Sequence, residues 1–214
     1  SELVKIISGL MEATEGKVTF KGEDVTNLWP DRLRKKGLGI IPEDRFAQGL
    51  CRSMSIGDNC IAGYHGDPEV CRMGLLNRKN INKKRDKAVK EFDIRVSDVE
   101  GDVSSLSGGN AQKIIVAREL AAKPDVLIAC QPTRGIDIGS IEFIHKQLLN
   151  YRNEGNAVIL ISSELSEIMS LSDRVIVMHK GRISGEIDPK DVDMMKVGLL
   201  MAGIRQEGEA QHDE

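Results

Sequence analysis

The stretch VLIACQPTRGID, residues 126–137, joins an apolar run to a turn that contains a proline and a glycine. A short apolar run rich in β-branched residues and bounded by turn residues is typical of a strand buried in a parallel sheet. In open α/β sheets, ligands bind outside the carboxyl ends of such strands. The residues at this position are Cys130 and Gln131, neither of which carries a carboxylate. The sequence therefore raises the question of whether this strand serves a catalytic site.

The segments on either side of this stretch predict an α/β fold. Apolar runs at GLGII (37–41) and NAVILIS (156–162) predict further strands, and helical periodicity begins near Asn110 and again covers 141–151. Strands that alternate with helices of this length predict βαβ units. We expect a mostly parallel sheet covered by helices on both faces.

The remaining segments predict a core and an insertion. We expect an α/β core over 1–45 and 111–204, a helical subdomain over 46–110, and a disordered polar tail over 205–214. Several local expectations follow from the sequence pattern. They are a helix from Ser1 through Leu10, a strand and turn at KVTFKGEDV (17–25), a helix near 80–94 with Asn82 as its N-cap, and core packing of Met194, Met195, Leu199, Leu200 and Met201.

The composition excludes several classes of protein. The chain has 214 residues, a net charge of −3 and only 3% aromatic residues, so it shows neither the basic surface nor the stacking platforms of a nucleic-acid-binding protein. Its 4 cysteines match no zinc or redox spacing, and its histidines match no metal spacing. No apolar run approaches the roughly 20 residues of a membrane span. We therefore expect no nucleic-acid partner and no metal held by a cysteine or histidine cluster.

The stretch LSGGNAQ, residues 106–112, places a serine and two glycines directly before a segment with helical apolar spacing. The first N–H groups of a helix have no partner inside it, and the helix dipole favours an anion at this end. Glycine lets the backbone approach the anion closely, and the hydroxyl of Ser107 adds a donor. This pattern is typical of a phosphate-binding site. Taken alone, it is also typical of a glycine turn that caps a helix.

With these motifs in order, the chain resembles the nucleotide-binding subunit of an ABC transporter. In particular it resembles the second ATPase half of the double-length ATPases that serve importers of simple sugars and, in one branch, of nucleosides. The matching motifs are the signature LSGGNAQ (106–112), the D-loop PTRGID (132–137), the Q-loop segment IPEDR (41–45) and the closing strands SDRVIVMHKGRISGE (172–186). Ser1 matches the last position of the Walker A motif. The resemblance thus implies a P-loop fold whose first strands and phosphate loop are absent from this chain, which we expect to be a C-terminal portion of a longer polypeptide.

The resemblance also implies that the Walker side of this half is degenerate. Cys130 stands where the family has an Asp that holds Mg²⁺, and a thiol is a poor ligand for that ion. Gln131 stands where a Glu polarises the attacking water, and an amide cannot accept the proton. Ser163 replaces the switch histidine, and Glu43 replaces the glutamine of the Q-loop. We expect no hydrolysis at this site.

The signature side is complete by the same resemblance, which implies a head-to-tail partner half. Ser107, Gly108 and Gly109 are expected to close over the ATP of that partner, with Gln112 facing the same interface and Asp137 at the seam. ATP and Mg²⁺ are then the cofactors, mainly at the shared site. The expected partners are the N-terminal ATPase half or a second ATPase subunit, the permease subunits and, indirectly, a solute-binding protein. The expected place is the cytoplasmic face of the membrane, as a peripheral subunit.

Other interpretations stay open at this point. The chain can be a non-catalytic regulatory or scaffold half, or, less favoured, a signature-bearing ATPase that acts on nucleic acid or ribosomes. Cys130 can be a small buried hydrophobe, and Asp137 a solvated turn residue. Glu43 can form an exposed ion pair that contributes little. The QPTRG variant favours the nucleoside branch over the sugar branch.

Overall fold

The computed structural model describes residues 2–190 and 193–204, which divide into two compact units, Ser1–Ile161 and Ser162–Glu214. Within the described part of the first unit, the central sheet has three parallel strands: β3 (Leu38–Ile41), β6 (Val126–Cys130) and β7 (Ala157–Ile161), in the order β3–β6–β7. Ile128 of β6 pairs with Ile40 on one side and with Ile159 on the other. The prediction of an α/β fold with a parallel sheet is confirmed.

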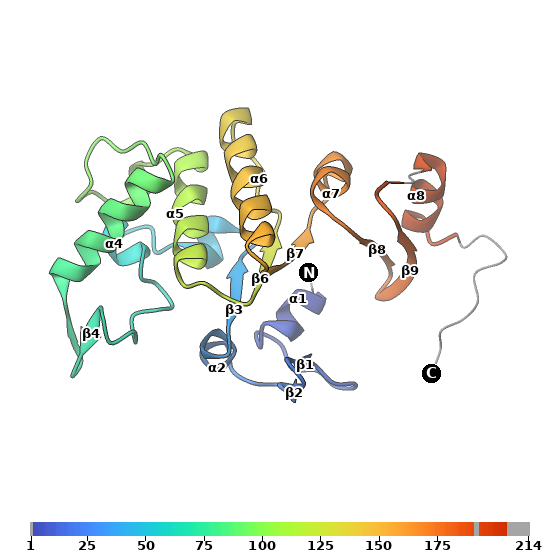
Figure 1. Ribbon diagram of the computed structural model, residues 1–214, viewed down its shortest axis with the longest axis horizontal. Helices are drawn as coiled ribbons and strands as arrows, with labels where there is room; N and C mark the ends of the chain where they lie inside the picture. Colours follow the sequence, from blue (N-terminus) through green and yellow to red (C-terminus); the bar gives the residue numbers. More distant parts are fainter. Residues whose placement is uncertain (1, 191–192, 205–214) are drawn as a thin grey trace. The chain divides into compact units, whose positions relative to one another are not determined.

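Alternate residues of the central strand β6 pack into two different hydrophobic clusters, one on each face of the sheet. Leu127 and Ala129 join the cluster that contains residues of α5 (Gly108–Ala121) and α6 (Ile138–Asn153). Ile128 and Cys130 join the cluster on the other face, which includes Leu33 of α2 (Pro30–Lys35) and residues of α1 (Glu2–Ile7). Figure 1 shows α5 and α6 on one side of the sheet and α1 and α2 on the other. Because both faces are covered, the strand is apolar throughout.

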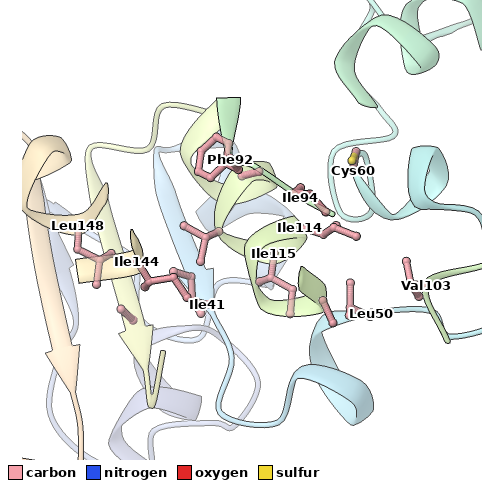
Figure 2. Packing of buried hydrophobic residues seen from close by; sticks show 14 of the residues in the cluster. Ile41, Leu50, Cys60, Phe92, Ile94, Val103, Ile114, Ile115, Ile144 and Leu148 are labelled. Carbon is pink, nitrogen blue, oxygen red and sulfur yellow. The ribbon is translucent and has the colours of Figure 1, made fainter. Parts of the chain in front are cut away.

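Helix α5 lies between the sheet and the helical insertion. Ile114 and Ile115 are fully buried in one continuous cluster that extends from Ile41 of the sheet to Val103 of the insertion (Figure 2). Each such side chain contributes about 1.5–3 kcal/mol on burial. The insertion contains α3 (Ile56–Asn59), the hairpin strands β4 (Cys71–Arg72) and β5 (Leu75–Leu76), and α4 (Arg78–Glu91), with short turns at Arg45–Gly49 and Val103–Ser105. The predicted boundaries at 45/46 and 110/111 stay a prediction.

Three local expectations were wrong. Helix α4 begins earlier than expected, because the side chain of Asn77 accepts a hydrogen bond from the N–H of Asn80, and Asn82 lies inside the helix. The N-terminal helix ends at Ile7, before Gly9 adopts a left-handed φ of 72°. The segment 17–25 is a hairpin of two short strands, β1 (Thr19–Phe20) and β2 (Glu23–Asp24), rather than one strand and a turn.

The second unit contains a short helix, a hairpin and a closing helix. They are α7 (Leu165–Leu171), the antiparallel pair β8 (Val175–His179) and β9 (Arg182–Ile187), and α8 (Met194–Met201). Val197 and Leu200 of α8 pack into the cluster of this unit. The expected core packing of the methionines was wrong, since Met194, Met195 and Met201 are 61%, 75% and 57% exposed. Helical spacing alone does not say how wide the buried stripe is.

No helix in the described ranges is both long enough and apolar enough to cross a membrane. The predicted tail, 205–214, lies outside the described residues.

Candidate functional site

The carboxyl ends of the three parallel strands open into a pocket of about 300 Å³. Its lining includes Lys5 and Ser8 near α1, Glu43 after β3, and Cys130 and Gln131 at the end of β6. The structure therefore brings together three of the residues that the sequence assigned to the Walker side. Ser1 lies outside the described residues. Ser163 belongs to the second unit, and its assignment to this site stays a prediction.

Cys130 is both a core residue and a wall of this pocket. It is 5% exposed and packs in the cluster that contains Leu38 and Ile128. Burial raises the pKa of its thiol to about 11, because the apolar surroundings disfavour the thiolate. The side chain is therefore a neutral thiol at neutral pH.

Gln131 begins the turn that follows β6. Its backbone N–H donates to the carbonyl of Ile161 at 2.7 Å, which continues the pairing with β7 by one residue. Its φ of 47° is unusual for a residue other than glycine. Strained backbone of this kind costs about 1–3 kcal/mol and persists where the surrounding structure enforces it. The turn thus fixes the direction in which Gln131 leaves the strand.

Glu43 is tied to the turn after β6 by an ion pair. The guanidinium of Arg134 donates from Nη1 to the Glu43 carboxylate at 3.1 Å, and both side chains are exposed. Asp44, the next residue, accepts from the N–H groups of Phe46 and Ala47 at 2.9 Å each. The hydrogen bonds from Ala47 and then Phe46 lower the pKa of Asp44. The segment after β3 is therefore ordered by its own side chains.

The signature stretch forms the start of α5. Ser107 is the exposed N-cap, and its hydroxyl accepts from the backbone N–H of Asn110 at 3.4 Å and from the side-chain amide of Asn110 at 3.0 Å. Because α5 begins at Gly108, both glycines lie in its first turn, where N–H groups have no partner within the helix. This arrangement suits an anion that approaches from outside the chain.

Gly109 lies against the start of α6. A side-chain carbon at this position would be 2.6 Å from Asp137 Oδ2. Asp137 caps α6 by accepting from the N–H of Ser140 at 2.9 Å and from its hydroxyl at 2.8 Å, and these bonds lower the pKa of Asp137. The starts of α5 and α6 are thus packed together, and only glycine fits at the contact.

A second pocket, of about 430 Å³, lies beside these two helix starts. Ser107, Asn110, Lys113 and Asp137 are among its lining residues. The sequence interpretation missed Asn110 and Lys113, although a spacing of three along a helix from the N-cap places both on the face of Ser107. Gln112 does not share this face. It is 2% exposed in this chain, and the expectation that it faces the partner interface stays a prediction.

A family model described as "ABC transporter" matches residues 1–134. This chain belongs to the ABC transporter family. The ABC chain is 41% identical over 206 residues to the guanosine import ATP-binding protein NupO of Bacillus subtilis, with 96% of this chain and 40% of that protein covered. It is 41% identical to the nucleoside import ATP-binding protein NupA of Lactococcus lactis, with 95% and 40% covered. It is 36% identical to a ribose import ATP-binding protein, RbsA, of Yersinia pestis, with 100% and 42% covered.

Solved structures agree with this membership at the level of the fold. A dimeric ATP-binding cassette, MJ0796, in a post-hydrolysis state with ADP and Pi matches the ABC chain with a TM-score of 0.74 at 20% identity, covering 89% of this chain and 81% of that one. A nucleotide-free ATP-binding cassette matches with a TM-score of 0.70 at 20% identity, covering 94% and 79%. The ABC chain spans about 40% of the length of the curated relatives named above.

ABC ATPases bind ATP, typically with Mg²⁺. The pocket at the strand ends and the start of α5 differ in how well their residues suit Mg²⁺ and phosphate. Mg²⁺ takes hard oxygen ligands. At the strand ends, the Cys130 thiol is neutral, and the Glu43 carboxylate is paired with Arg134. These residues do not suit a Mg²⁺ site. At the start of α5, the exposed Ser107 hydroxyl and the first-turn N–H groups suit a phosphate.

Proposed function

We propose that this chain is the second, degenerate ATPase half of a double-length import ATPase and that it supplies its signature to the hydrolytic site of the partner half. The coverage of relatives supports this proposal. Nearly the whole chain matches about 40% of each import ATP-binding protein, which leaves room for another ATPase half in a protein of that length.

One observation carries the proposal. The start of α5 presents donors that suit an anion, whereas Cys130 and Gln131 at the end of β6 carry no carboxylate. Ser107 is exposed at the N-cap of a 14-residue helix. Cys130 is a buried thiol that is neutral at neutral pH, and Gln131 cannot accept a proton. A positioned general base contributes about 10²- to 10⁴-fold in rate. The strand-end pocket then holds nucleotide without turning it over.

The chain's own residues bind and orient at the shared site. The hydroxyl of Ser107 and the N–H groups of Gly108 and Gly109 approach the terminal phosphate of an ATP that the partner half holds. Bound ATP supplies the phosphoryl group. Donors fixed in advance by a helix stabilise developing charge without reorganisation at the moment of reaction. Asp137 lies at the seam because it caps the helix beside Gly109.

We infer the partners and the cellular location from membership of the ABC transporter family. They are the partner ATPase half, permease subunits in the membrane and, through the permease, a solute-binding protein. The chain then works as a peripheral subunit at the cytoplasmic face. We infer a nucleoside as the transported solute, because guanosine and nucleoside importers are 41% identical to this chain, against 36% for the ribose importer.

The test compares two substitutions in the double-length protein assembled with its permease. In Ser107→Arg, the larger side chain occupies the space where the phosphate would lie. The substitution is expected to lower ATPase activity by about 100-fold, which is in the range for loss of an oxyanion donor. Cys130→Ala is expected to leave the activity within about twofold. Similar losses from both substitutions contradict the proposal. If neither changes the activity, the chain is instead a scaffold half.

A further inference from the structure

Arg45 lies where three segments of the first unit meet. Its Nη2 donates to the backbone carbonyl of Arg134, in the turn after β6. Its Nη1 is 3.6 Å from the position that a side-chain carbon on Gly108 would occupy, at the start of α5. Its Nη2 is 3.6 Å from the corresponding position on Gly135. One guanidinium therefore bonds to the turn after β6 and lies beside the signature glycine Gly108.

The backbone that carries Arg45 is fixed at both ends. On one side, Asp44 caps the π-helical turn Arg45–Gly49. On the other side, Gly49 packs on α5, since a side-chain carbon there would lie 2.5 Å from Ile115 Cδ1. The carbonyl of Gly49 also accepts from Arg118 Nη1 of the same helix at 2.8 Å. Arg45 thus projects from a segment already anchored to the signature helix.

Glu43 and Arg45 hold the same residue in two different ways. Glu43 accepts from the side chain of Arg134, whereas Arg45 donates to its backbone carbonyl. The Glu43–Arg134 ion pair is exposed and contributes little to stability. The bond from Arg45 is also exposed, but it acts on the backbone itself, and the Arg45 residue is half-buried. Arg45 therefore links the backbone of this turn to the segment that is anchored on α5, beside Gly108.

We propose that Arg45 is a positioning residue that holds the signature turn at Gly108 in register with the turn 131–136, so that Ser107 meets the phosphate of the partner half. This inference rests on the proposed function. It deepens that function by naming what aligns the signature. Alignment matters because a misplacement of about 1 Å can cost about 100-fold in rate. Arg45 acts through the backbone of these turns and does not itself contact the phosphate.

The experiment uses the double-length protein with its permease and measures kcat, KM for ATP, equilibrium nucleotide binding and Tm. Arg45→Met removes the donors while keeping the aliphatic stem. It is expected to lower kcat about tenfold or more, with KM, nucleotide binding and Tm close to those of the parent. Arg45→Lys keeps a positively charged donor group, the ammonium, and is expected to recover part of kcat. Arg52→Met is the matched control, because Arg52 stacks on Phe46 at 5.0 Å in the same region and is expected to stay within about twofold.

Four results overturn this inference. If Arg45→Met behaves like Arg52→Met while Ser107→Arg still lowers activity by about 100-fold, Arg45 has no positioning role and the proposed function stands. A raised KM or weaker nucleotide binding with unchanged kcat makes Arg45 a ligand contact instead. A large fall in Tm that Arg45→Lys does not recover makes the residue a fold determinant. If Ser107→Arg is itself without effect, the proposed function fails first, and the inference fails with it.

Discussion

A side-chain carbon on Gly109 would lie 2.3 Å from the hydroxyl oxygen of Ser140. The first turn of the signature helix α5 is therefore in contact with the first turn of α6. Because Ser140 also donates to Asp137, the N-cap of α6, the contact joins the signature and the turn after β6 into one packed unit.

Gly109→Ala is expected to destabilise the protein by about 1–3 kcal/mol, because the added methyl group overpacks the contact with Ser140. It is also expected to lower ATPase activity by displacing Ser107. Gly139→Ala is the control, since a side-chain carbon there meets only Asp137 Oδ1 at an ordinary 3.5 Å. Denaturant unfolding of both variants checks the stability. Equal unfolding midpoints for the two variants would contradict the tight contact.

Glu119 of α5 is fully buried and holds the helix to its surroundings through charge-assisted hydrogen bonds. Its carboxylate accepts from Arg34 Nη1 at 2.8 Å and from the Tyr64 hydroxyl at 2.7 Å. It also accepts from Arg118 Nε at 3.1 Å. Glu119→Ala leaves the buried guanidinium of Arg118 and the half-buried guanidinium of Arg34 without this carboxylate, and is expected to cost about 3–5 kcal/mol.

Tyr64→Phe is the matched variant for this network, because it removes one hydroxyl and leaves the charges paired. It is expected to cost only about 1 kcal/mol. Chemical denaturation of both variants measures the difference. A Glu119→Ala loss no larger than that of Tyr64→Phe would show that the network is not the anchor of α5.

Thiol reactivity is expected to separate the buried cysteines from the exposed Cys51. Burial raises the pKa of Cys130 to about 11 and that of Cys60 to about 12. Because the thiolate is the reactive form, alkylation of the folded protein at pH 8 is expected to label Cys51 and to spare these two. Mass spectrometry of the alkylated protein checks the sites. Fast labelling of Cys130 at pH 8 would contradict its burial.

The same pKa shift predicts a direction for stability. When the pKa of a thiol is higher in the folded than in the unfolded state, the folded state is more stable while the thiol is protonated than when it is a thiolate. For Cys130 that contribution is fully present below pH 9, the ordinary value for the group, and is lost as the pH rises through about 11. Unfolding of Cys130→Ala is therefore expected to depend less on pH across this window than unfolding of the parent. An unchanged pH dependence would remove Cys130 as its cause.

Glu43→Gln is expected to change stability by less than about 1 kcal/mol, because the ion pair with Arg134 is exposed. ATPase activity is expected to stay near that of the parent, since Arg45 still holds the turn through the Arg134 carbonyl. Steady-state kinetics and thermal unfolding check both expectations. A loss as large as that of Arg45→Met would assign the positioning role to the ion pair instead.

The sequence pattern was sufficient for the parallel sheet and for the residues at its carboxyl end. β6 is apolar at every position, and its end places Cys130 and Gln131 in one pocket with Glu43. A continuous apolar run indicates a strand whose two faces are both buried. The predicted start of α5 was also close to the observed one. An N-cap serine followed by glycines is a local signal that depends on few distant contacts.

Other features depended on contacts that are distant in the sequence. Gln112 is buried because α5 packs on the insertion as well as on the sheet. Most side chains in this part of the helix are therefore buried, polar ones included. The contact of Arg45 with Arg134 spans 89 residues, and no periodicity marks it. Asn77 caps α4 directly after the hairpin β4–β5, and no sequence pattern predicted that hairpin.

The central claim is that the double-length protein hydrolyses ATP at one site, to which this chain contributes the signature. Trapping of ADP with vanadate, which mimics the phosphoryl group in its transition state, counts the hydrolytic sites directly. The account predicts one trapped ADP for each double-length molecule, and none after Ser107→Arg. Two trapped ADP molecules for each protein would show that the Cys130 side also hydrolyses ATP, and would contradict the account.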